Sequence, residues 1–253
     1  MSSVTDGRLD GSVALVTGAS SGIGEATAEL LAEEGASVAL AARREDRLES
    51  LADRIQTEGG EAITIPTDVT DESAVREMVE TTVDEFGRLD VLVNNAGVML
   101  LEPVAEADPD NWRQMLEVNV LGLMTASQSA ADVMEEQGSG DIVNVSSVAG
   151  RKAYAGSSGY NASKFGVNGF SESLREELVD TDVRVTMIEP GVVDTELPEH
   201  IPDEDQKEMV EQMTEGMEPL QAGDIARAIR YAVSQPTHVD VNELLIRPTR
   251  QEL

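Results

Sequence analysis

The chain has 253 residues, of which 49 are acidic and 18 are basic, giving a formal net charge of −31 at pH 7. Nucleic acid and anionic membrane surfaces are themselves negatively charged, so this balance excludes them as partners. The sequence contains no cysteine, which excludes disulfide bonds, thiol nucleophiles and thiolate-bound metals.

The acidic residues are spread along the chain, whereas lysine is confined to Lys152, Lys164 and Lys207. Such an acidic, lysine-poor surface looks like that of proteins from organisms with high internal salt, where ions screen the self-repulsion. The polar stretch Met1–Asp10 lacks the apolar core of a signal peptide, and no stretch reaches the roughly 20 apolar residues of a membrane helix. We therefore expect a cytoplasmic protein with a single domain, residues 1–253.

Strand and helix patterns alternate from one end of the chain to the other. The predicted strands are Val13–Val16, Ser37–Ala41, Ala62–Pro66, Val91–Asn94, Asp141–Val145, Val183–Ile188 and Glu243–Ile246. The predicted helices are Glu25–Glu34, Glu45–Glu58, Asp71–Phe86, Pro109–Glu136, Ser157–Val179 and Ala222–Ser234. Thr70 or Asp71 can cap the third helix and Gly87 can end it. The alternation predicts an α/β fold with a doubly wound parallel sheet, helices on both faces and ligands at the carboxyl ends of the strands.

A glycine-rich turn follows the first predicted strand and leads into the first predicted helix. This order presents backbone N–H groups and a helix N-terminus to an anion, which suits a dinucleotide pyrophosphate. The spacing Gly18-x-x-x-Gly22-x-Gly24 differs from the common G-x-G-x-x-G, and glycine turns also occur where nothing binds. The candidate binding residues of the turn are Gly18, Ala19, Ser20, Ser21, Gly22, Ile23 and Gly24.

The polar segment 194–217 interrupts the alternation and contains Pro198 and Pro202. It is either a surface insertion or a lid over a site at the strand ends. Because it follows the carboxyl end of a strand, we favour the lid.

Tyr160 and Lys164 are four residues apart near the start of a predicted helix, so they share one face. A lysine ammonium near a tyrosine favours the phenolate and lowers its pKa from about 10. Such a pair can exchange a proton with an alcohol or carbonyl oxygen, although Tyr–Lys pairs at this spacing are also common as surface packing. Lys164 is one of only three lysines and follows a strand, which favours the catalytic interpretation.

The order and spacing of the motifs resemble the short-chain dehydrogenase/reductase family over nearly the whole chain. The motifs are Thr17-Gly-Ala-Ser-Ser-Gly-Ile-Gly24, Asp68-Val69, Asn94-Asn-Ala-Gly97, Asn119, Ser146-Ser147, Tyr160-Asn-Ala-Ser-Lys164 and Pro190-Gly-Val-Val-Asp-Thr195. The chain looks most similar to the small NADP-dependent dehydrogenases of 3-hydroxy acids, by Arg43-Arg44, Tyr154-Ala-Gly156 and the tail Val241–Thr249. The resemblance implies a Rossmann-like sheet of about seven strands in the order 3-2-1-4-5-6-7. It also implies hydride transfer between a secondary alcohol, such as a 3-hydroxy acid, and its carbonyl compound.

The resemblance implies a role for each matching catalytic residue. Tyr160 would be the general acid/base, and Lys164 would hold the cofactor ribose and lower the pKa of Tyr160. Ser147, which fits the family spacing where Ser146 does not, would bind the substrate oxygen. Asn119 would hold a water of the proton relay, unless it is a polar helix residue that faces solvent or another chain.

Further cofactor contacts are also implied by the resemblance. They fall on Asp68, Val69, Asn95, Ala96, Gly97, Pro190, Gly191, Val193 and Thr195. Asn94 is expected to stabilise the central strands instead of touching the cofactor.

The end of the second predicted strand bears on the choice of cofactor. NAD-specific members of the family place an acid where Ala42 stands, and this chain continues with Arg43 and Arg44. Arginine suits a phosphate, and Arg43 matches the family's 2′-phosphate position, so the resemblance implies NADP(H). Alternatively, the two arginines only offset Glu45 and Asp46.

Other polar residues have weaker functional interpretations. Arg151 or Lys152 could bind a substrate carboxylate, but solvent exposure is the favoured interpretation. His200 and His238 have no partner at metal-ligand spacing, so no metal site is expected. Trp112 and the run Met99–Leu101 are expected to pack in the core, with the run at the border of the pocket.

Two other functions are alternatives to that of a dehydrogenase. An NAD(P)-binding sensor without turnover would be expected to lack part of the set Ser147, Tyr160 and Lys164. Epimerases and dehydratases with the same tyrosine and lysine carry a substrate domain for which this chain has no room.

The resemblance also implies a homotetramer, with the helices Pro109–Glu136 and Ser157–Val179 pairing across a two-fold axis. Their apolar residues include Val118, Leu121, Leu123, Met124, Phe165, Val167 and Phe170.

Overall fold

The computed structural model describes residues 9–214 and 216–252, so most of the polar stretch Met1–Asp10 and one position of the predicted lid lie outside the described residues. The strands are β1 (Val13–Thr17), β2 (Ser37–Ala42), β3 (Glu61–Pro66), β4 (Val91–Asn94), β5 (Gly140–Val145), β6 (Val183–Pro190) and β7 (Glu243–Ile246). They form one sheet in the order β3-β2-β1-β4-β5-β6-β7, and every pairing is parallel. The predicted fold class and strand order are therefore confirmed.

The α-helices alternate with the strands, as the sequence pattern predicts. They are α1 (Gly22–Glu33), α2 (Glu45–Thr57), α3 (Glu72–Phe86), α4 (Pro109–Leu116), α5 (Leu123–Gln137), α6 (Ser158–Glu177), α7 (Glu204–Thr214) and α8 (Ala222–Val233). Asp71, not Thr70, caps α3 by accepting hydrogen bonds from Ser73 N at 2.9 Å and Ala74 N at 3.2 Å. Gly87 ends that helix in the left-handed conformation, with φ +82°.

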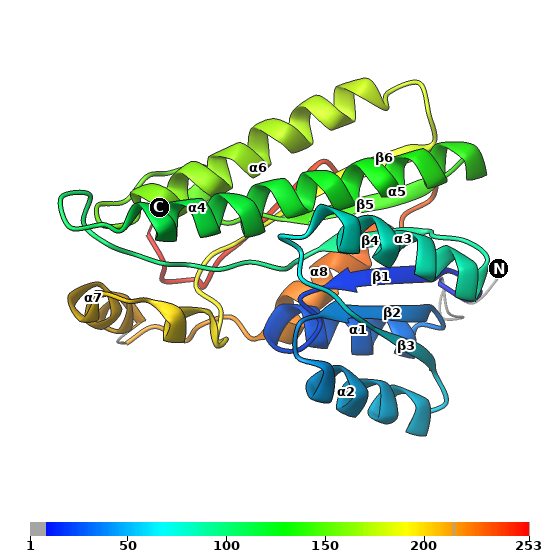
Figure 1. Ribbon diagram of the computed structural model, residues 1–253, viewed down its shortest axis with the longest axis horizontal. Helices are drawn as coiled ribbons and strands as arrows, with labels where there is room; N and C mark the ends of the chain where they lie inside the picture. The colour runs from blue at the N-terminus through cyan, green and yellow to red at the C-terminus, as the bar shows by residue number, and fades with distance from the viewer. Residues whose placement is uncertain (1–8, 215, 253) are drawn as a thin grey trace.

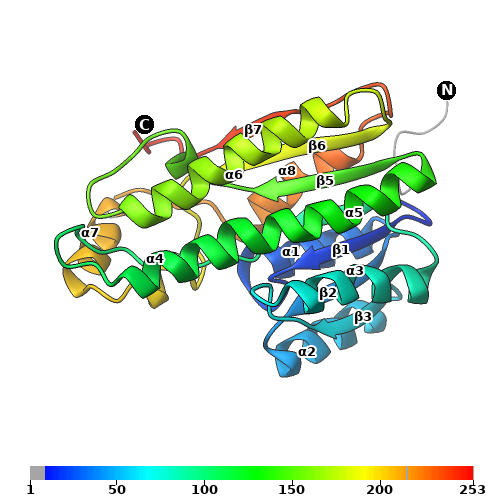
Figure 2. The ribbon, with the colours of Figure 1, turned by 45° about the horizontal axis from the view of Figure 1, so that its top comes forward.

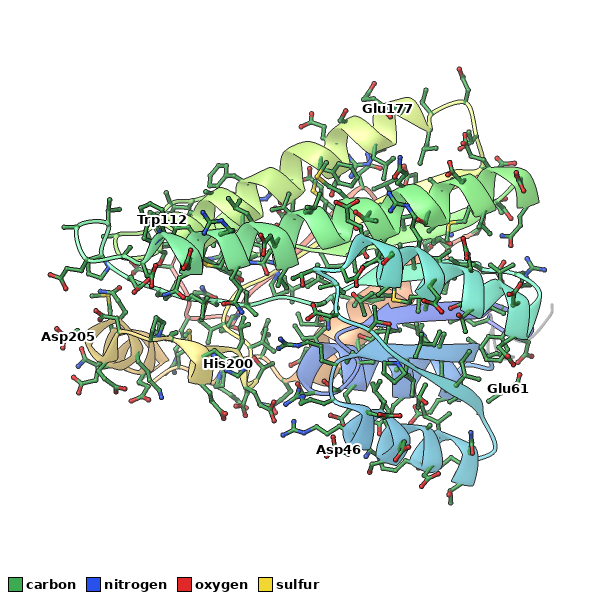
Figure 3. All side chains as sticks on the ribbon, in the orientation of Figure 1. Asp46, Glu61, Trp112, Glu177, His200 and Asp205 are labelled. Carbon is green, nitrogen blue, oxygen red and sulfur yellow. The ribbon has the colours of Figure 1, made fainter. Side chains whose placement is uncertain are left out.

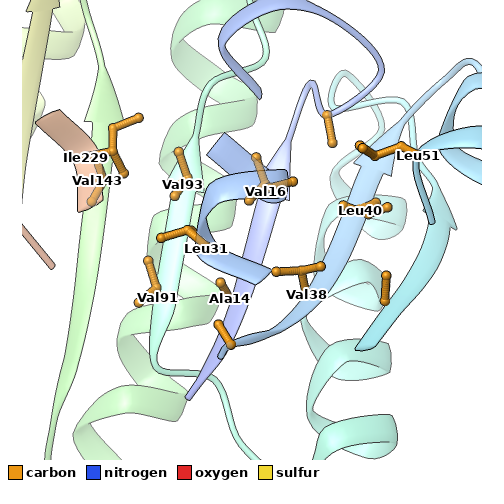
Figure 4. Packing of buried hydrophobic residues seen from close by; sticks show 14 of the residues in the cluster. Ala14, Val16, Leu31, Val38, Leu40, Leu51, Val91, Val93, Val143 and Ile229 are labelled. Carbon is orange, nitrogen blue, oxygen red and sulfur yellow. The ribbon is translucent and has the colours of Figure 1, made fainter. Parts of the chain in front are cut away.

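Helices cover both faces of the sheet (Figures 1 and 2). On one face, Val16 of β1 and Val93 of β4 belong to the same buried cluster as Leu31 of α1 and Ile229 of α8 (Figure 4). On the other face, a second cluster contains residues of α3, α5 and α6. All five residues of β1 are buried, which explains its continuous apolar run, since a central parallel strand meets a helix layer on each side.

The long helix predicted over Pro109–Glu136 is not a regular α-helix throughout. A π-helical segment, Glu117–Gly122 (η1), joins α4 to α5. The π turn is one residue wider than an α turn, and Asn119 lies within it, buried. The predicted long helix is therefore present, but it departs from the α-helical pattern at the position of a predicted functional residue.

The polar segment 194–217 contains the short 3₁₀ helix η3 (Leu197–His200) and α7. A second 3₁₀ helix, η2 (Val148–Gly150), follows β5. Figure 1 shows α7 at the same end of the molecule as the start of α4. The strand arrows point toward this end, so the segment lies where the parallel strands finish.

Candidate active site

The strands β1, β4, β5 and β6 are neighbours in the sheet and end at Thr17, Asn94, Val145 and Pro190. Because they run parallel, these four ends lie along one edge. The loops that leave this edge carry almost all of the residues predicted to act on a cofactor or substrate. The topology thus brings together motifs that are up to about 170 residues apart in the sequence.

The glycine turn after β1 packs directly against the end of β4. Gly18 has φ +66°, and a Cβ atom at this position would lie 2.9 Å from Cα of Ala96. Asn95 holds the turn by donating from Nδ2 to Thr17 O at 3.0 Å. The Thr17 hydroxyl in turn accepts hydrogen bonds from the N–H groups of Asn95 and Ala96. The Asn95 side chain therefore supports the turn, and the part played by Thr17 Oγ1 could not be predicted because its partners are 78 and 79 positions away.

The N-terminus of α1 opens at this turn. Ser21 precedes the helix, and among the described residues no side chain caps it, whereas Asp71 caps α3 and Asp108 caps α4. Gly22 has φ +58°, which a residue with a side chain rarely adopts. A helix N-terminus and a turn with room only for glycine provide amide donors that fit the pyrophosphate of a dinucleotide.

The structure assigns the two adjacent arginines different surroundings. Arg44 donates from Nε to Ser20 Oγ at 3.1 Å and from Nη2 to Ser21 Oγ at 2.7 Å, so its guanidinium lies against the glycine turn. Its Nη1 pairs with Glu196 Oε2 at 2.9 Å. Arg43 is exposed. The family spacing singled out Arg43, but Arg44 is the arginine that the fold places beside the turn.

The remaining predicted cofactor residues lie on the surrounding loops. Asp68 is exposed after β3 and accepts from Thr70 N at 3.0 Å, while Val69 is half-buried beside it. Asn94 is buried and donates to Ser127 Oγ and Asn144 Oδ1, both at 2.9 Å, so it links strands and α5 as expected.

The loop after β6 runs back over the glycine turn. Gly191 N donates to Ile246 O at 2.7 Å, and Val193 forms an isolated parallel bridge with Leu220. Thr195 lies against the turn, because a Cβ atom at Gly22 would be 3.1 Å from Thr195 Cγ2. The predicted nicotinamide loop and the predicted pyrophosphate turn are therefore in contact range of each other.

Tyr160 and Lys164 are both buried on α6, with 7% and 6% exposure. Lys164 Nζ lies 5.7 Å from the Tyr160 ring centroid and donates to Val145 O at 2.9 Å. Burial raises the pKa of Tyr160 to about 12, although the nearby Ser147 hydroxyl acts in the opposite direction. Burial lowers the pKa of Lys164 to about 8. The expected lowering of the Tyr160 pKa by Lys164 is thus not seen, because loss of hydration dominates both groups.

The two serines after β5 face different partners. Ser147 lowers the pKa of Tyr160 and so lies near its hydroxyl, and the Ser147 hydroxyl accepts from Ala149 N at 3.1 Å at the start of η2. The Ser146 hydroxyl is buried and donates to Asn168 of α6. Ser147 is accordingly the serine placed beside the tyrosine.

Asn119 reaches across from the π-helical segment to the loop after β4. Its side chain accepts from Val98 N at 2.8 Å and donates to Val98 O at 2.9 Å. Nδ2 also donates to Ser163 Oγ at 3.0 Å. Asn119 is 1% exposed, which rules out the interpretation that it faces solvent. A Cβ atom at Gly97 would lie 3.4 Å from Asn119 Oδ1 and 3.9 Å from Lys164 Nζ, so Gly97 borders both groups.

The segment 194–217 packs beside these residues. Ile201 is buried in one cluster with Tyr160, Leu101 and Met115, and Trp112 packs against that cluster, as do the remaining residues of the run Met99–Leu101. Gln206 of α7 fills the space next to Gly156, where a Cβ atom would clash with Gln206 Oε1. Figure 3 shows Trp112, His200 and Asp205 at the same end of the molecule.

Arg151 is not a free cation. It pairs with the fully buried Glu189 at 2.6 Å and also with Glu243. Lys152 is exposed, with Nζ 5.6 Å from the ring centroid of Tyr154. Arg151 is exposed, as expected, with 40% of its side chain accessible, and its guanidinium, which could have bound a substrate carboxylate, is already paired with two acids. His200 and His238 are exposed, as expected.

Within residues 9–214 and 216–252, no helix combines the length and the apolar character that crossing a membrane requires.

Comparison with known proteins agrees with this architecture. A family model described as short chain dehydrogenase matches residues 12–206. An uncharacterized oxidoreductase of Staphylococcus saprophyticus is 41% identical over 244 residues, covering 95% of this chain and 97% of that protein.

Two solved structures are also similar over nearly their full lengths. One is an alcohol dehydrogenase from the archaeon Thermococcus sibiricus complexed with 5-hydroxy-NADP, with a TM-score of 0.85 and 31% identity, covering 96% of this chain and 98% of that chain. The other is the closed form of a serine dehydrogenase complexed with NADP⁺, with a TM-score of 0.86 and 34% identity, covering 95% and 96%.

Proposed function

The chain belongs to the short-chain dehydrogenase family, and from this premise we propose that it is an NADP(H)-dependent oxidoreductase. It would interconvert a secondary alcohol and its carbonyl compound, with Ser147, Tyr160, Lys164 and Asn119 as the catalytic group. The observation that carries the proposal is that Tyr160 is buried with Lys164 Nζ 5.7 Å from its ring centroid, while Ser147 is near enough to influence the pKa of the phenol.

Each residue of this group has a part that its position supports. Ser147 and Tyr160 would hold the substrate oxygen between two hydroxyl groups, and Tyr160 would give a proton to it or take one from it. Lys164 would bind the ribose and supply positive charge near the phenol. Asn119 and the hydroxyl of Ser163 would continue the proton path away from the substrate. Bound NADP(H) would supply or accept the hydride.

NADP(H) is preferred to NAD(H) in this proposal because Arg44 lies against the glycine turn and Ala42 supplies no carboxylate. A planar guanidinium fits a 2′-phosphate, which an acid at position 42 would repel. Both structural relatives named above are complexes with NADP⁺ or an NADP analogue. In this chain Arg44 takes the part that the family spacing assigns to Arg43.

The substrate would bind between the loop after β4 and the segment 194–217, which we propose as the lid. Leu101, Met115 and Ile201 make the surroundings of Tyr160 apolar, which suits an alcohol with a hydrocarbon portion. The narrower class of 3-hydroxy acids requires a cation, and Lys152 is the remaining candidate because Arg151 is already paired with two carboxylates.

Replacement of Tyr160 by phenylalanine tests the proposed reaction. We expect Tyr160→Phe to keep its fold and its affinity for NADP(H) and to lose about 10²–10⁴-fold in kcat, the usual contribution of a general acid or base. Turnover is followed by nicotinamide absorbance with a panel of secondary alcohols and ketones in high salt. Tyr231→Phe, which removes a hydroxyl from an exposed residue of α8, is the matched control. A Tyr160→Phe enzyme with unchanged kcat would refute the mechanism, and a wild type that lacks turnover would favour the sensor.

A further inference from the structure

Glu196 lies at the beginning of the proposed lid and forms ion pairs with two arginines, Arg44 and Arg47. Its Oε2 atom is 2.9 Å from Arg44 Nη1, and its Oε1 atom is 2.7 Å from Arg47 Nη1. The two arginines lower the pKa of Glu196 to about 2, so the carboxylate is ionised at any physiological pH. A single carboxylate thus neutralises much of the positive charge on this side of the glycine turn.

Each of the three outer nitrogens of Arg44 has a partner. Nε donates to Ser20, Nη2 donates to Ser21, and Nη1 donates to Glu196. These bonds use three of the five N–H donors of the guanidinium, so a phosphate that binds Arg44 lies next to Glu196 and competes with it for the positive charge. The serine hydroxyls are neutral and belong to the turn, whereas Glu196 is anionic and would repel a phosphate that carries about −1.5 to −2 charges. Glu196 is the partner that a phosphate is expected to displace.

We propose that Glu196 limits the preference for NADP(H) over NAD(H) by competing with the 2′-phosphate for Arg44. The inference rests on the proposed function, because it assumes that Arg44 receives the 2′-phosphate. Arg47 gives Glu196 a second partner, so the carboxylate can leave Arg44 and remain ion-paired. The same carboxylate belongs to the segment 194–217, so uptake of the 2′-phosphate is coupled to the position of that segment.

An ordinary surface ion pair is the alternative explanation of this geometry. The side chains of Arg44, Arg47 and Glu196 are 39%, 44% and 36% exposed, and exposed pairs typically contribute only about 0–1 kcal/mol to stability. The two explanations predict different measurements. A purely structural pair would change thermal stability without changing the discrimination between ligands with and without the phosphate.

The test uses two cofactor fragments that lack nicotinamide, 2′,5′-ADP and 5′-AMP, with affinities measured by isothermal titration calorimetry at one fixed salt concentration. We expect the wild type to bind 2′,5′-ADP more tightly, and Glu196→Gln to increase this preference by about fivefold, which corresponds to about 1 kcal/mol. Glu199→Gln removes an exposed carboxylate three residues further along the chain and is the matched control. It should leave the preference unchanged.

The outcomes separate this inference from the proposed function. A wild type without preference for 2′,5′-ADP would overturn the assignment of NADP(H). A wild type with that preference, but with Glu196→Gln equal to Glu199→Gln or weaker than the wild type, would overturn only the role of Glu196. Melting temperatures of the three proteins show that each variant is folded when its affinities are measured.

Discussion

Tyr160 and Lys164 lose most of their hydration because α6 packs against the end of β5. Each group therefore favours its neutral form, which raises the pKa of the tyrosine to about 12 and lowers that of the lysine to about 8. Tyr160 keeps its proton at neutral pH, which suits an acid that protonates the oxygen of a carbonyl substrate. Lys164 changes charge close to the pH at which most enzymes work.

The buried lysine predicts a pH-dependent stability. Lys164 binds its proton more weakly in the folded state, so between about pH 8 and 10.5 the unfolded state holds more protons and stability increases with pH. Relative to Lys164→Met, the free energy of unfolding of the wild type should increase by about 2 kcal/mol from pH 7.5 to 9.5. Urea unfolding at the two pH values measures the difference. Lys152→Met, which removes an exposed amine, should show a constant difference, and a constant difference for Lys164→Met would disprove the shift.

At the residue scale, the sequence predicted contacts between residues that are close along one helix, but it did not predict every contact between distant residues. The spacing of Tyr160 and Lys164 on one helical turn placed them on one face, because helical periodicity is local. The choice between Arg43 and Arg44 depends on the direction in which the chain leaves β2, which spacing does not reveal. Glu196 is 152 positions from Arg44 and belongs to no motif, so no local signal could have identified the pair.

A network of side chains connects the elements around the catalytic loop. Ser146 donates to Asn168 of α6, Asn168 donates to Glu189 of β6 at 2.9 Å, and Glu189 pairs with Arg151, which follows η2. Glu189 is fully buried, and a buried carboxylate needs a partner of opposite charge, which Arg151 supplies. The network fixes the loop after β5 on α6 and β6, and Ser147 lies on that loop.

This network predicts unequal effects for two adjacent cations. Arg151→Met would leave the buried carboxylate of Glu189 facing Glu243 without its charged partner and should lower the free energy of unfolding by about 1–3 kcal/mol. Lys152→Met removes a neighbouring exposed cation and should change stability by no more than about 0.5 kcal/mol. Thermal or urea unfolding compares the two variants. Equal effects would mean that the network does not stabilise the loop.

At the element scale, the strands and helices could be predicted because each buries an apolar face with a simple period. The predicted strands differ from the observed ones by at most two residues at either end, as in β6, which extends to Pro190. The π-helical segment was not predictable in this way, since it inserts one residue without disturbing the apolar pattern on either side. Its cause is tertiary, because Asn119 gains two hydrogen bonds with the backbone of Val98.

The molecule as a whole carries far more negative than positive charge, and every ion pair among the described residues uses arginine. The planar guanidinium can bind a carboxylate through two parallel hydrogen bonds, as Arg184 does with Asp141. The remaining acids repel one another over a distance that salt controls. A surface adapted to high salt is a proposal that this imbalance supports.

We expect the melting temperature to fall when salt is reduced from 1 M to 0.1 M, because the Debye length grows from about 3 Å to about 10 Å. A loss of roughly 3 kcal/mol would correspond to about 10 °C for a chain of this length. Differential scanning calorimetry measures the change, and equal melting temperatures would contradict the salt hypothesis. Light scattering on the same samples shows whether the proposed homotetramer is present and whether it dissociates.

The structure divides the apolar residues proposed for assembly into buried, half-buried and exposed ones, and Val118 and Phe170 are half-buried. Leu123 and Val167 are buried within the chain and are not available to a partner. Leu121, Met124 and Phe165 are 43%, 37% and 45% exposed, and they lie on η1, α5 and α6. The exposed group supports the proposal that these helices pair between subunits.

The positions of the three lysines determine where lysine-reactive reagents can attach to this protein. Lys164 is buried, Lys152 follows η2 and Lys207 is half-buried on α7, so the lysine amines within reach of solvent lie at the end of the sheet that carries the candidate active site. Coupling to an activated resin through lysine would therefore tether the enzyme by the rim of its own site and obstruct entry of substrate. Carboxylates are abundant over the rest of the surface, so attachment through them would leave that end facing the solution.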